Sequence, residues 1–401
     1  MKVLMISDVY FPRVNGVSTS IQTFRCELAG LGHQVDLIAP EYPGGPSSEN
    51  GVTRVSSRYV PFDPEDRMMR SAGVRALISR LHDEKYDLVH IQTPFVAHYR
   101  GIEIADALAV PRVESYHTFF EEYLFHYVPL LPRAFLRGLS RRFSRTQCNR
   151  MNALIVPSSA MRDKLAEYGI SVPMHVIPTG IPVSQFAGGD RGAFRRRHGI
   201  PEDRPVLLFV GRVAYEKNID FLVRALRLAL PQNPHLLLII AGEGPALESL
   251  KKLTEKSGLR DNVLFVGYLD RQGALQDCYH AADAFVFASR TETQGLVLLE
   301  AMALGVPVIS TAVMGTRDVV GPRRGALVPQ DDEADFAAHI VTLMNKPGLQ
   351  ARLSGEARVY VREWHADTLA RRLAAAWQDV ISTPTPLPPH TSPLALEAER
   401  V

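Results

Sequence analysis

Short apolar runs alternate with segments of helical periodicity along most of the chain. Residues 3–6 form the first run, apolar positions then recur every three or four residues from Val17 to Leu31, and residues 35–39 form the next run. Such a succession predicts a β-strand, an α-helix and a second strand parallel to the first. Further strands are predicted in the first half of the chain at residues 88–91, 112–115, 154–156 and 175–177.

The same alternation restarts in the second half, after a Gly-rich stretch at residues 187–191 and a basic one at residues 195–198. The strands predicted there are residues 206–210, 236–241, 263–266, 284–288 and 306–310. Strands that alternate with helices are typical of parallel sheets covered by helices. We therefore predict the α/β class, with two doubly wound parallel-sheet domains that face a cleft, because ligands of such sheets bind beyond the carboxyl ends of the strands.

The predicted domain boundaries follow these changes of pattern. Residues 1–185 are expected to form an N-terminal Rossmann-like domain, and residues 186–363 a C-terminal one. Residues 364–381 are predicted as a helix that packs back toward the N-terminal domain. Residues 382–401 contain five prolines and little apolar periodicity, so we expect this tail to be disordered.

Composition and charge exclude several classes of protein. The formal net charge of +2 over 401 residues gives no reason to expect a nucleic-acid partner. The three cysteines, Cys26, Cys148 and Cys278, are far apart in sequence, which argues against both a disulfide framework and a zinc site. No apolar run reaches the roughly 18–20 residues that span a bilayer. A cytoplasmic location is the simplest interpretation, and contact with a membrane surface is not excluded.

Two acidic residues in the second half of the chain indicate a binding site. Glu292 lies in the loop after a predicted strand, and Glu300 lies in the helix that begins near Gly295. Leu298 and Leu299 precede Glu300, and an acid in an apolar helical run is costly unless it is paired or hydrogen-bonded. Ribose hydroxyls would satisfy Glu300, sugar hydroxyls could satisfy Glu292, and the amides at the helix start could bind phosphate. The alternative is that Glu292 only interacts with the helix dipole and that Glu300 is exposed to solvent.

The two glutamates, followed by Ala-Met-Ala-Leu-Gly-Val-Pro-Val-Ile, resemble the signature of the GT-B retaining glycosyltransferases of family 4. The resemblance covers almost the whole chain. It includes Asn15-Gly16, the region of His117, and the segments at residues 211–217 and 241–245. It implies an N-terminal domain on the acceptor side, a C-terminal domain that binds a nucleotide sugar, and a hexosyltransferase activity.

The resemblance also implies roles for the matching residues. Arg212 and Lys217 would grip the donor diphosphate, Glu292 would contact the transferred sugar, and Glu300 would bind the nucleotide ribose. His117 would contact the sugar, although a lone histidine is more often structural. The implied catalytic residues are His117, Glu292, Arg212 and Lys217. The implied donor-binding residues are Gly16, Arg212, Lys217, Tyr268, Leu269, Glu292, Gln294, Gly295, Leu296 and Glu300.

Retaining enzymes of this fold have no convincing protein nucleophile, so the family implies front-face displacement. The donor phosphate helps to deprotonate the acceptor, while the protein positions the substrates and stabilises charge. No Asp-x-Asp motif is suitably placed, and the pair Asp331-Asp332 is predicted to cap a helix. We therefore expect neither a metal ion nor another cofactor.

A basic stretch without Asp or Glu extends from Tyr123 to Arg162. Leucine and phenylalanine residues interleave with the arginines, which predicts an amphipathic helix suited to an anionic membrane surface. The alternative is a packed helix with a solvated basic face. The arginines expected at the membrane are Arg133, Arg137, Arg141, Arg142 and Arg145.

The run His-Thr-Phe-Phe-Glu-Glu-Tyr at residues 117–123, followed by this basic stretch, resembles the diacylglycerol glucosyltransferases of the family. That branch implies UDP-glucose or a related UDP-sugar as donor, a lipid such as diacylglycerol as acceptor, and a peripheral position on the inner face of the cell membrane. Mannosyltransferases that use GDP-mannose and phosphatidylinositol, or a glycan, share the layout. A nucleotide-sugar 2-epimerase would need no acceptor surface, and a non-catalytic sensor should lack Glu292, Arg212 or Lys217. The sequence leaves the oligomeric state open.

Overall fold

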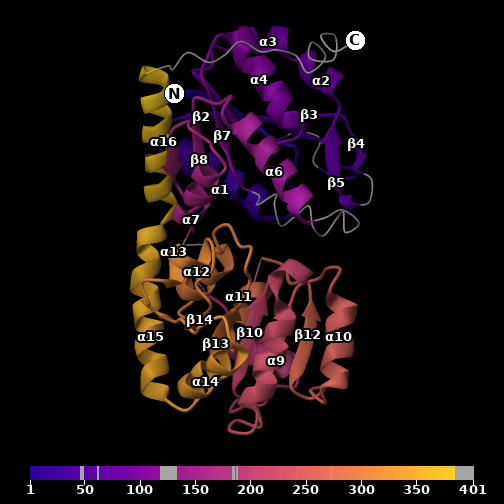
Figure 1. Ribbon diagram of the computed structural model, residues 1–401, viewed down its shortest axis with the longest axis vertical. Coiled ribbons are helices and arrows are strands. Elements are labelled where there is room, and N and C mark those ends of the chain that lie inside the picture. The colour runs from indigo at the N-terminus through magenta and orange to yellow at the C-terminus, as the bar shows by residue number, and fades with distance from the viewer. Residues whose placement is uncertain are drawn as a thin grey trace.

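The computed structural model describes residues 1–45, 49–60, 63–117, 133–182, 186, 188–271 and 273–383. Within these residues the chain forms two α/β domains, one above the other in Figure 1, each built on a parallel β-sheet. The predicted fold class is therefore confirmed. The described residues include no helix that is both long and apolar enough to cross a membrane.

The N-terminal sheet has, in the described part of the chain, seven parallel strands in the order β3-β2-β1-β6-β7-β8-β9. Strands β6 and β8 are buried at every position, because helices cover both faces of the sheet. The strands are β1 (Lys2–Ile6), β2 (Gln34–Pro40), β3 (Val52–Val55), β6 (Leu88–Ile91), β7 (Arg112–Ser115), β8 (Ala153–Val156) and β9 (Met174–Val176). The helices are α1 (Gly16–Gly30), α2 (Ser71–Arg75), α3 (Ile78–His82), α4 (Val96–Leu108), α6 (Arg133–Cys148) and α7 (Ser159–Glu167).

The C-terminal sheet has the order β12-β11-β10-β13-β14-β15, and β10 is buried throughout. Its strands are β10 (Val206–Val210), β11 (Leu237–Ala241), β12 (Val263–Gly267), β13 (Ala284–Phe287), β14 (Val308–Ser310) and β15 (Ala326–Leu327). Its helices are α8 (Arg191–Arg197), α9 (Ile219–Ala229), α10 (Leu247–Lys256), α11 (Ala274–Ala281), α12 (Leu296–Ala303), α13 (Thr316–Val320), α14 (Glu333–Met344) and α15 (Pro347–Tyr360), with the 3₁₀ turns η2 (Tyr215–Lys217) and η3 (Val361–Trp364).

The chain passes between the two domains twice, and the two connecting segments lie side by side. The Ile181 amide donates to the Trp364 carbonyl at 2.9 Å, and the Ala366 amide donates to the Ile181 carbonyl at 3.1 Å. The two chain segments touch so closely that a Cβ on Gly180 would lie 2.4 Å from the Ala366 Cα. This contact fixes where α16 (Ala366–Ser382) begins.

Helix α16 runs along one side of the N-terminal domain (Figure 1) and packs against α1. It contributes Leu369, Leu373 and Trp377 to the apolar core that contains Val3 and Met5 of β1. The C-terminal helix thus completes the core of the first domain, because one face of the N-terminal sheet buries its apolar side chains against it.

Several local expectations differ from the structure. Helix α1 begins at Gly16, one residue before the helical spacing that starts at Val17, because the Asn15 side chain caps the helix by accepting from the Ser18 amide at 2.8 Å. Strand β14 begins at Val308 rather than at residue 306, because the Val306 amide donates to the Ala301 carbonyl at the end of α12. The predicted disordered tail lies outside the described residues from 384 onward.

Candidate functional site

The predicted diphosphate-binding residues lie at the point where the order of the C-terminal sheet reverses. Strand β10 pairs with β11 on one side and with β13 on the other, so the loops that follow β10 and β13 separate at this edge. Arg212 and Lys217 follow β10, and Glu292 follows β13. The strand order therefore brings together Lys217 and Glu292, which are 75 positions apart in the sequence.

An ion pair joins two of these residues. The Lys217 Nζ lies 2.6 Å from the Glu292 Oε2, and the two side chains are about one-fifth exposed, at 22% and 19%. Both groups are therefore reachable by a ligand and are partly shielded from water. The carboxylate holds the ammonium group at the carboxyl edge of the sheet, and the ammonium group in turn offsets the charge of the acid.

The backbone around Lys217 is held in place by close contacts. A Cβ on Gly242 would lie 1.9 Å from the Gly211 carbonyl oxygen, so the loops after β10 and β11 can meet only at glycine. The Asn218 Nδ2 donates to the Ala288 carbonyl at 3.0 Å and ties the first loop to the end of β13. Arg212 is exposed at the start of this constrained segment.

The loop that carries Glu292 ends at the first turn of α12. The Gly315 amide donates to the Glu292 carbonyl at 2.9 Å, which anchors the loop to the segment before α13. Gly295 immediately precedes Leu296, the first residue of α12. The positive end of the α12 dipole therefore lies next to Glu292 and Lys217, an arrangement that favours an anionic ligand.

Glu300 is buried inside α12, with 3% of its surface exposed. Its Oε1 accepts from the Arg271 Nη1 at 2.9 Å, and its Oε2 accepts from the Tyr279 hydroxyl at 3.0 Å. The neighbouring carboxylate raises the pKa of Arg271, and burial together with Glu300 holds the pKa of Tyr279 well above its usual range. The alternative of a solvated helix position at Glu300 is therefore wrong.

Tyr268 and Leu269 follow β12, at the same carboxyl edge of the sheet. The Tyr268 side chain is 60% exposed, whereas Leu269 packs partly against the core of the domain. The Arg271 that binds Glu300 comes from the same segment, so the loop after β12 and helix α12 are joined through one ion pair.

Gln294 uses its side chain to contact the other domain. Its Oε1 accepts from the Thr179 amide at 2.8 Å, and its Nε2 donates to the Thr179 carbonyl at 2.7 Å. Next to it, the Thr293 hydroxyl donates to the His117 carbonyl at 3.2 Å. The loop that carries Glu292 thus contacts the loop of His117 directly. The Gln294 side-chain amide is bonded to backbone groups and is not directed at a ligand.

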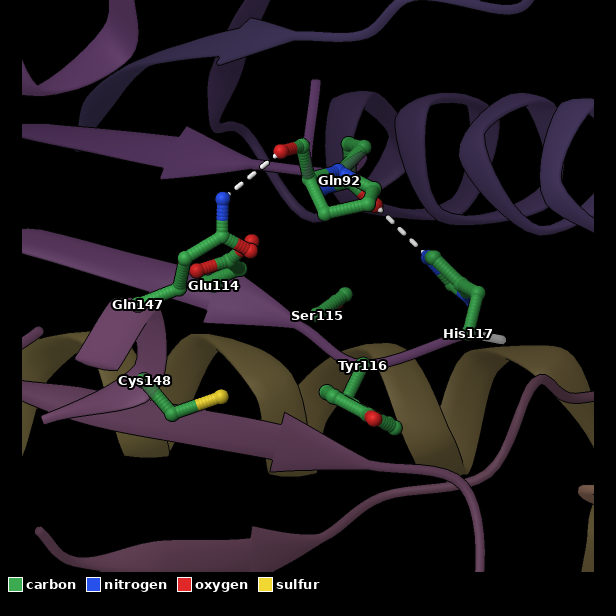
Figure 2. Close-up of a pocket in the computed structure, with 8 residues that line it drawn as sticks. Gln92, Glu114, Ser115, Tyr116, His117, Gln147 and Cys148 are labelled. Carbon is green, nitrogen blue, oxygen red and sulfur yellow. Dashed lines mark hydrogen bonds between the residues drawn. The ribbon is translucent and has the colours of Figure 1, made fainter. Parts of the chain in front are cut away.

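His117 lies at the carboxyl end of β7, next to the small pocket drawn in Figure 2. Its Nε2 bonds to the Gln92 Oε1 at 3.0 Å. Because an amide oxygen only accepts, the Nε2 carries the proton and the Nδ1 is left as the acceptor. Burial lowers the pKa of His117 to about 4, so the ring is neutral at physiological pH. The pocket volume of about 10 Å³ has room for one water molecule and none for a sugar.

Two histidines at this edge, the buried His90 and the half-buried His117, predict a pH-dependent stability. Burial lowers the pKa of His90 to about 3 and that of His117 to about 4, while it raises the pKa of Asp8 to about 6. Unfolded histidine binds a proton near 6.5, so between pH 6.5 and 4 the unfolded chain binds more histidine protons and stability rises with pH. Asp8 acts in the opposite direction. Because its pKa is higher in the folded protein, the folded form binds more protons between the unfolded and folded pKa values, and stability falls there as pH rises.

Replacing His117 by Gln should remove one histidine contribution. We expect the loss of unfolding free energy between pH 7 and pH 5 to be smaller in His117→Gln than in the wild type, by up to about 1.4 kcal/mol per pH unit below 6.5. Urea unfolding at the two pH values measures this loss. His82→Gln, which changes an exposed imidazole on α3, is the control and should behave as the wild type. Equal losses in all three proteins would show that His117 is not held neutral by the fold.

Helix α6 carries the predicted membrane-facing arginines. Phe135 and Leu139 are 59% and 50% exposed, and Arg137, Arg142 and Arg145 are exposed as well, whereas Leu136 is buried. Exposed aromatic, aliphatic and cationic side chains therefore share the outer surface of one helix. The predicted separation into an apolar and a basic face is thus incomplete.

Arg141 differs from these exposed arginines. The Arg141 guanidinium lies 5.2 Å from the centre of the Tyr168 ring and is only partly exposed. The Arg133 side chain, and residues 118–132 that precede α6, lie outside the described part of the structure.

The structure adds residues that the sequence did not single out. Gln92 orients His117, and Thr179 binds Gln294. Asn218 joins the loops after β10 and β13. Arg271 and Tyr279 bind Glu300. The burial of Glu300 in an apolar run was a signal that partners existed. The pair Asp331-Asp332 has the predicted capping role, since the Asp332 side chain accepts from the amides of Ala334 and Asp335.

Comparison with known families and proteins gives a consistent result. Residues 190–360 match the family model described as glycosyl transferases group 1, and residues 14–185 match that of glycosyltransferase family 4. The chain is 34% identical to an alpha-monoglucosyldiacylglycerol synthase of Streptococcus pneumoniae, over 77% of this chain and 71% of the relative. It is 30% identical to a GDP-mannose-dependent alpha-mannosyltransferase of Mycolicibacterium smegmatis, over 90% of this chain and 94% of the relative.

Solved structures show the same fold. A sucrose-phosphate synthase from Thermosynechococcus elongatus superimposes with a TM-score of 0.77 at 22% identity, over 95% of this chain and 99% of that one. The Anabaena protein HepE in complex with UDP-glucose superimposes with a TM-score of 0.73 at 17% identity, over 94% of this chain and 100% of that one. At such identities the likeness establishes the architecture alone.

Proposed function

This chain belongs to the GT-B glycosyltransferases of family 4, and from that premise we propose that it transfers a hexose, with retention, from a UDP-sugar to a membrane lipid such as diacylglycerol. The observation that carries the proposal is the Lys217–Glu292 pair at the reversal point of the C-terminal sheet. A cation for the diphosphate and an acid for the sugar hydroxyls lie side by side there, next to the loop of His117.

The proposed donor contacts follow from charge and geometry. Lys217 and Arg212 bind the diphosphate, together with the amide end of α12 at Gly295 and Leu296. When the phosphate takes a share of Lys217, the Glu292 carboxylate can accept hydrogen bonds from the hexose. Glu300 retains acceptor sites beyond those used by its two protein partners, since a carboxylate offers about four, and so can bind the ribose.

The catalytic contribution of these residues is electrostatic. As the glycosidic bond breaks, negative charge develops on the departing nucleoside diphosphate, and the two fixed cations and the helix dipole stabilise it. The neutral His117 offers its Nδ1 as an acceptor for a sugar hydroxyl rather than acting as a charged acid. Holding both substrates in one geometry supplies the remainder of the rate increase.

The choice of a lipid acceptor rests on two kinds of support, whereas the UDP-sugar donor rests on the resemblance of residues 117–123 to the diacylglycerol glucosyltransferases. The relative from Streptococcus pneumoniae is named an alpha-monoglucosyldiacylglycerol synthase, and it is 34% identical over 77% of this chain. The exposed Phe135 and Leu139, with Arg137 and Arg142 beside them, give α6 the chemistry of a membrane-surface helix. The second candidate is a GDP-mannose-dependent transferase, which the relative from Mycolicibacterium smegmatis supports.

One transfer assay separates these candidates. The protein is incubated with single radiolabelled UDP- or GDP-sugars and a bacterial lipid extract, and the organic phase is counted after extraction. We expect label from a UDP-hexose in the organic phase, and an α-anomeric product by proton NMR if the configuration is retained. Label from GDP-mannose alone would support the second candidate. Label that stays in the aqueous phase with every donor would contradict a lipid acceptor.

A further inference from the structure

A carboxylate of the C-terminal domain reaches the start of a helix in the N-terminal domain. The Asp318 Oδ2 accepts from the Ser159 amide at 2.6 Å, and its Oδ1 accepts from the Ser159 hydroxyl at 2.5 Å. Ser159 is the first residue of α7, and Asp318 lies in α13. These two helices lie at the facing ends of the two domains in Figure 1. The contact therefore joins residues that are 159 positions apart in the sequence.

The start of α7 is a favourable place for a negative charge. The amides of the first turn of a helix have no acceptor within the helix, and the helix dipole places partial positive charge there. The Ser158 side chain accepts from the Met161 amide at 3.3 Å, and Asp318 accepts from the Ser159 amide. Hydrogen bonds to a charged acceptor are stronger than those to a neutral one. Asp318 thus completes the cap of a helix that belongs to the other domain.

The segment before Asp318 packs tightly against the Glu292 loop (residues 288–295), which connects β13 to α12. A Cβ on Gly315 would lie 2.0 Å from the Thr293 carbonyl oxygen, and the Gly315 amide donates to the Glu292 carbonyl at 2.9 Å. The buried Thr316 hydroxyl bonds to the backbone of the turn after β14 and fixes the shape of that turn. A movement of α13 therefore also moves the backbone of Glu292.

The Glu292 loop is held against the N-terminal domain on two sides. On one side, its own Thr293 and Gln294 bond to backbone groups of His117 and Thr179. On the other side, Asp318 binds α7 through the attached α13. The buried Tyr360 hydroxyl at the end of α15 donates to the carbonyl of residue 318 at 3.3 Å, so α13 is also fixed within its own domain. The contact with α7 therefore bears on the position of the whole loop.

We propose that Asp318 is a positioning residue for hexose transfer, which holds the Glu292 loop at a fixed place against the N-terminal domain. The inference rests on the proposed function, in which Glu292 contacts the hexose. Asp318 touches neither substrate and acts by setting the position of Glu292 relative to the loop of His117. Two substrates held by different domains react only when both are kept in one geometry. Loss of Asp318 therefore lowers the rate, while Lys217 and Arg212, which lie in a single domain, still bind the diphosphate.

Steady-state kinetics test this role. Asp318→Ala should lower kcat by roughly tenfold, because hydrogen bonds to a charged group are lost, while the affinity for UDP in calorimetry stays that of the wild type. Asp318→Asn keeps an acceptor for the Ser159 amide and a donor for its hydroxyl, so it should restore most of kcat. Asp332→Ala is the matched control. Asp332 caps α14 within the C-terminal domain, so this variant should lose stability and keep its kcat.

Hydrogen exchange followed by mass spectrometry separates this role from that of a local helix cap. Loss of a local cap speeds exchange only at the start of α7. Loss of a contact that positions the Glu292 loop also speeds exchange at the Thr179 amide, which bonds to Gln294 at 2.8 Å. We expect faster exchange at both places in Asp318→Ala and at neither place in Asp332→Ala. The measurement needs no hexose transfer, so it decides the inference even where the proposed function fails.

Ser159→Ala removes the hydroxyl bond alone and provides a second variant if Asp318→Ala does not fold. Its loss of kcat should be smaller, and the double variant should behave as Asp318→Ala, since the two side chains share one interaction. A wild-type kcat in Asp318→Ala, or faster exchange confined to α7, would overturn the inference. Absence of transfer from the wild-type protein, with faster exchange at Thr179 in Asp318→Ala, would contradict the proposed function and support the contact.

Discussion

Exchanging the charges of the Lys217–Glu292 pair, in a Lys217→Glu/Glu292→Lys double variant, is expected to abolish hexose transfer and to leave the protein folded. The exchange restores an ion pair at the same place, since the side chains lie 2.6 Å apart on adjoining loops. It puts an acid where the diphosphate needs a cation. A pair that served only the fold would tolerate the exchange, whereas a pair that binds the donor would not.

The single variants should separate the two roles. Lys217→Ala is expected to lower kcat/KM by about a hundredfold or more, the usual loss when one preorganised charge is removed from a transition state. It should also weaken the binding of UDP in calorimetry. Glu292→Gln should retain the affinity for UDP and lose the added affinity for the UDP-hexose, because the acid contacts the sugar and not the nucleotide.

Lys251→Ala is the matched control for this experiment. Lys251 pairs with Glu248 on the exposed surface of α10 in the same domain, at 2.9 Å. Such surface pairs contribute little to stability, so transfer and UDP binding should stay at wild-type values. Transfer that survives in the charge-exchanged protein, with an unchanged kcat/KM in both single variants, would refute the assignment of the donor site.

Three strands were predicted with correct bounds, and two of them, β6 and β10, bury every residue. Residues 88–91 and 206–210 match β6 and β10, because a largely apolar run between turns leaves little choice of where a buried strand begins. Residues 112–115 match β7, although its sequence contains Arg112 and Glu114. Strands β3, β4 (Ser57–Val60) and β5 (Asp63–Met69) were not predicted. They contain arginine, serine and aspartate, and their pairing partners come from tertiary structure rather than from a local pattern.

The candidate site also contains contacts between distant residues that no local pattern predicts. An acid within an apolar helix indicated that Glu300 must have partners, yet nothing local identified Arg271 and Tyr279, which are 29 and 21 residues away. The resemblance placed Gln294 at the donor, and its side chain instead binds the backbone of Thr179 in the N-terminal domain. That contact depends on how the two domains meet, which periodicity and motif spacing do not encode.

Replacing Arg137 and Arg142 on α6 by Ser should weaken the binding of the protein to anionic vesicles by roughly 30-fold, since each arginine near such a surface contributes about 1 kcal/mol. Both side chains are exposed in the structure, so the folded protein should retain its thermal stability. Sedimentation with vesicles that contain phosphatidylglycerol measures the binding. The remaining binding should depend less on salt concentration, because fewer ionic contacts are left to screen.

The exposed apolar pair on the same helix tests whether α6 enters the membrane interface or only approaches it. Phe135→Ser/Leu139→Ser removes apolar surface without changing charge, so it should weaken binding while the salt dependence stays that of the wild type. Arg141→Ser is a matched arginine control, because its guanidinium packs over the Tyr168 ring. It is expected to lower the thermal stability more than it lowers vesicle binding. If neither the Arg137/Arg142 nor the Phe135/Leu139 variant changes sedimentation, α6 is a packed helix with a solvated basic surface and the membrane contact lies elsewhere.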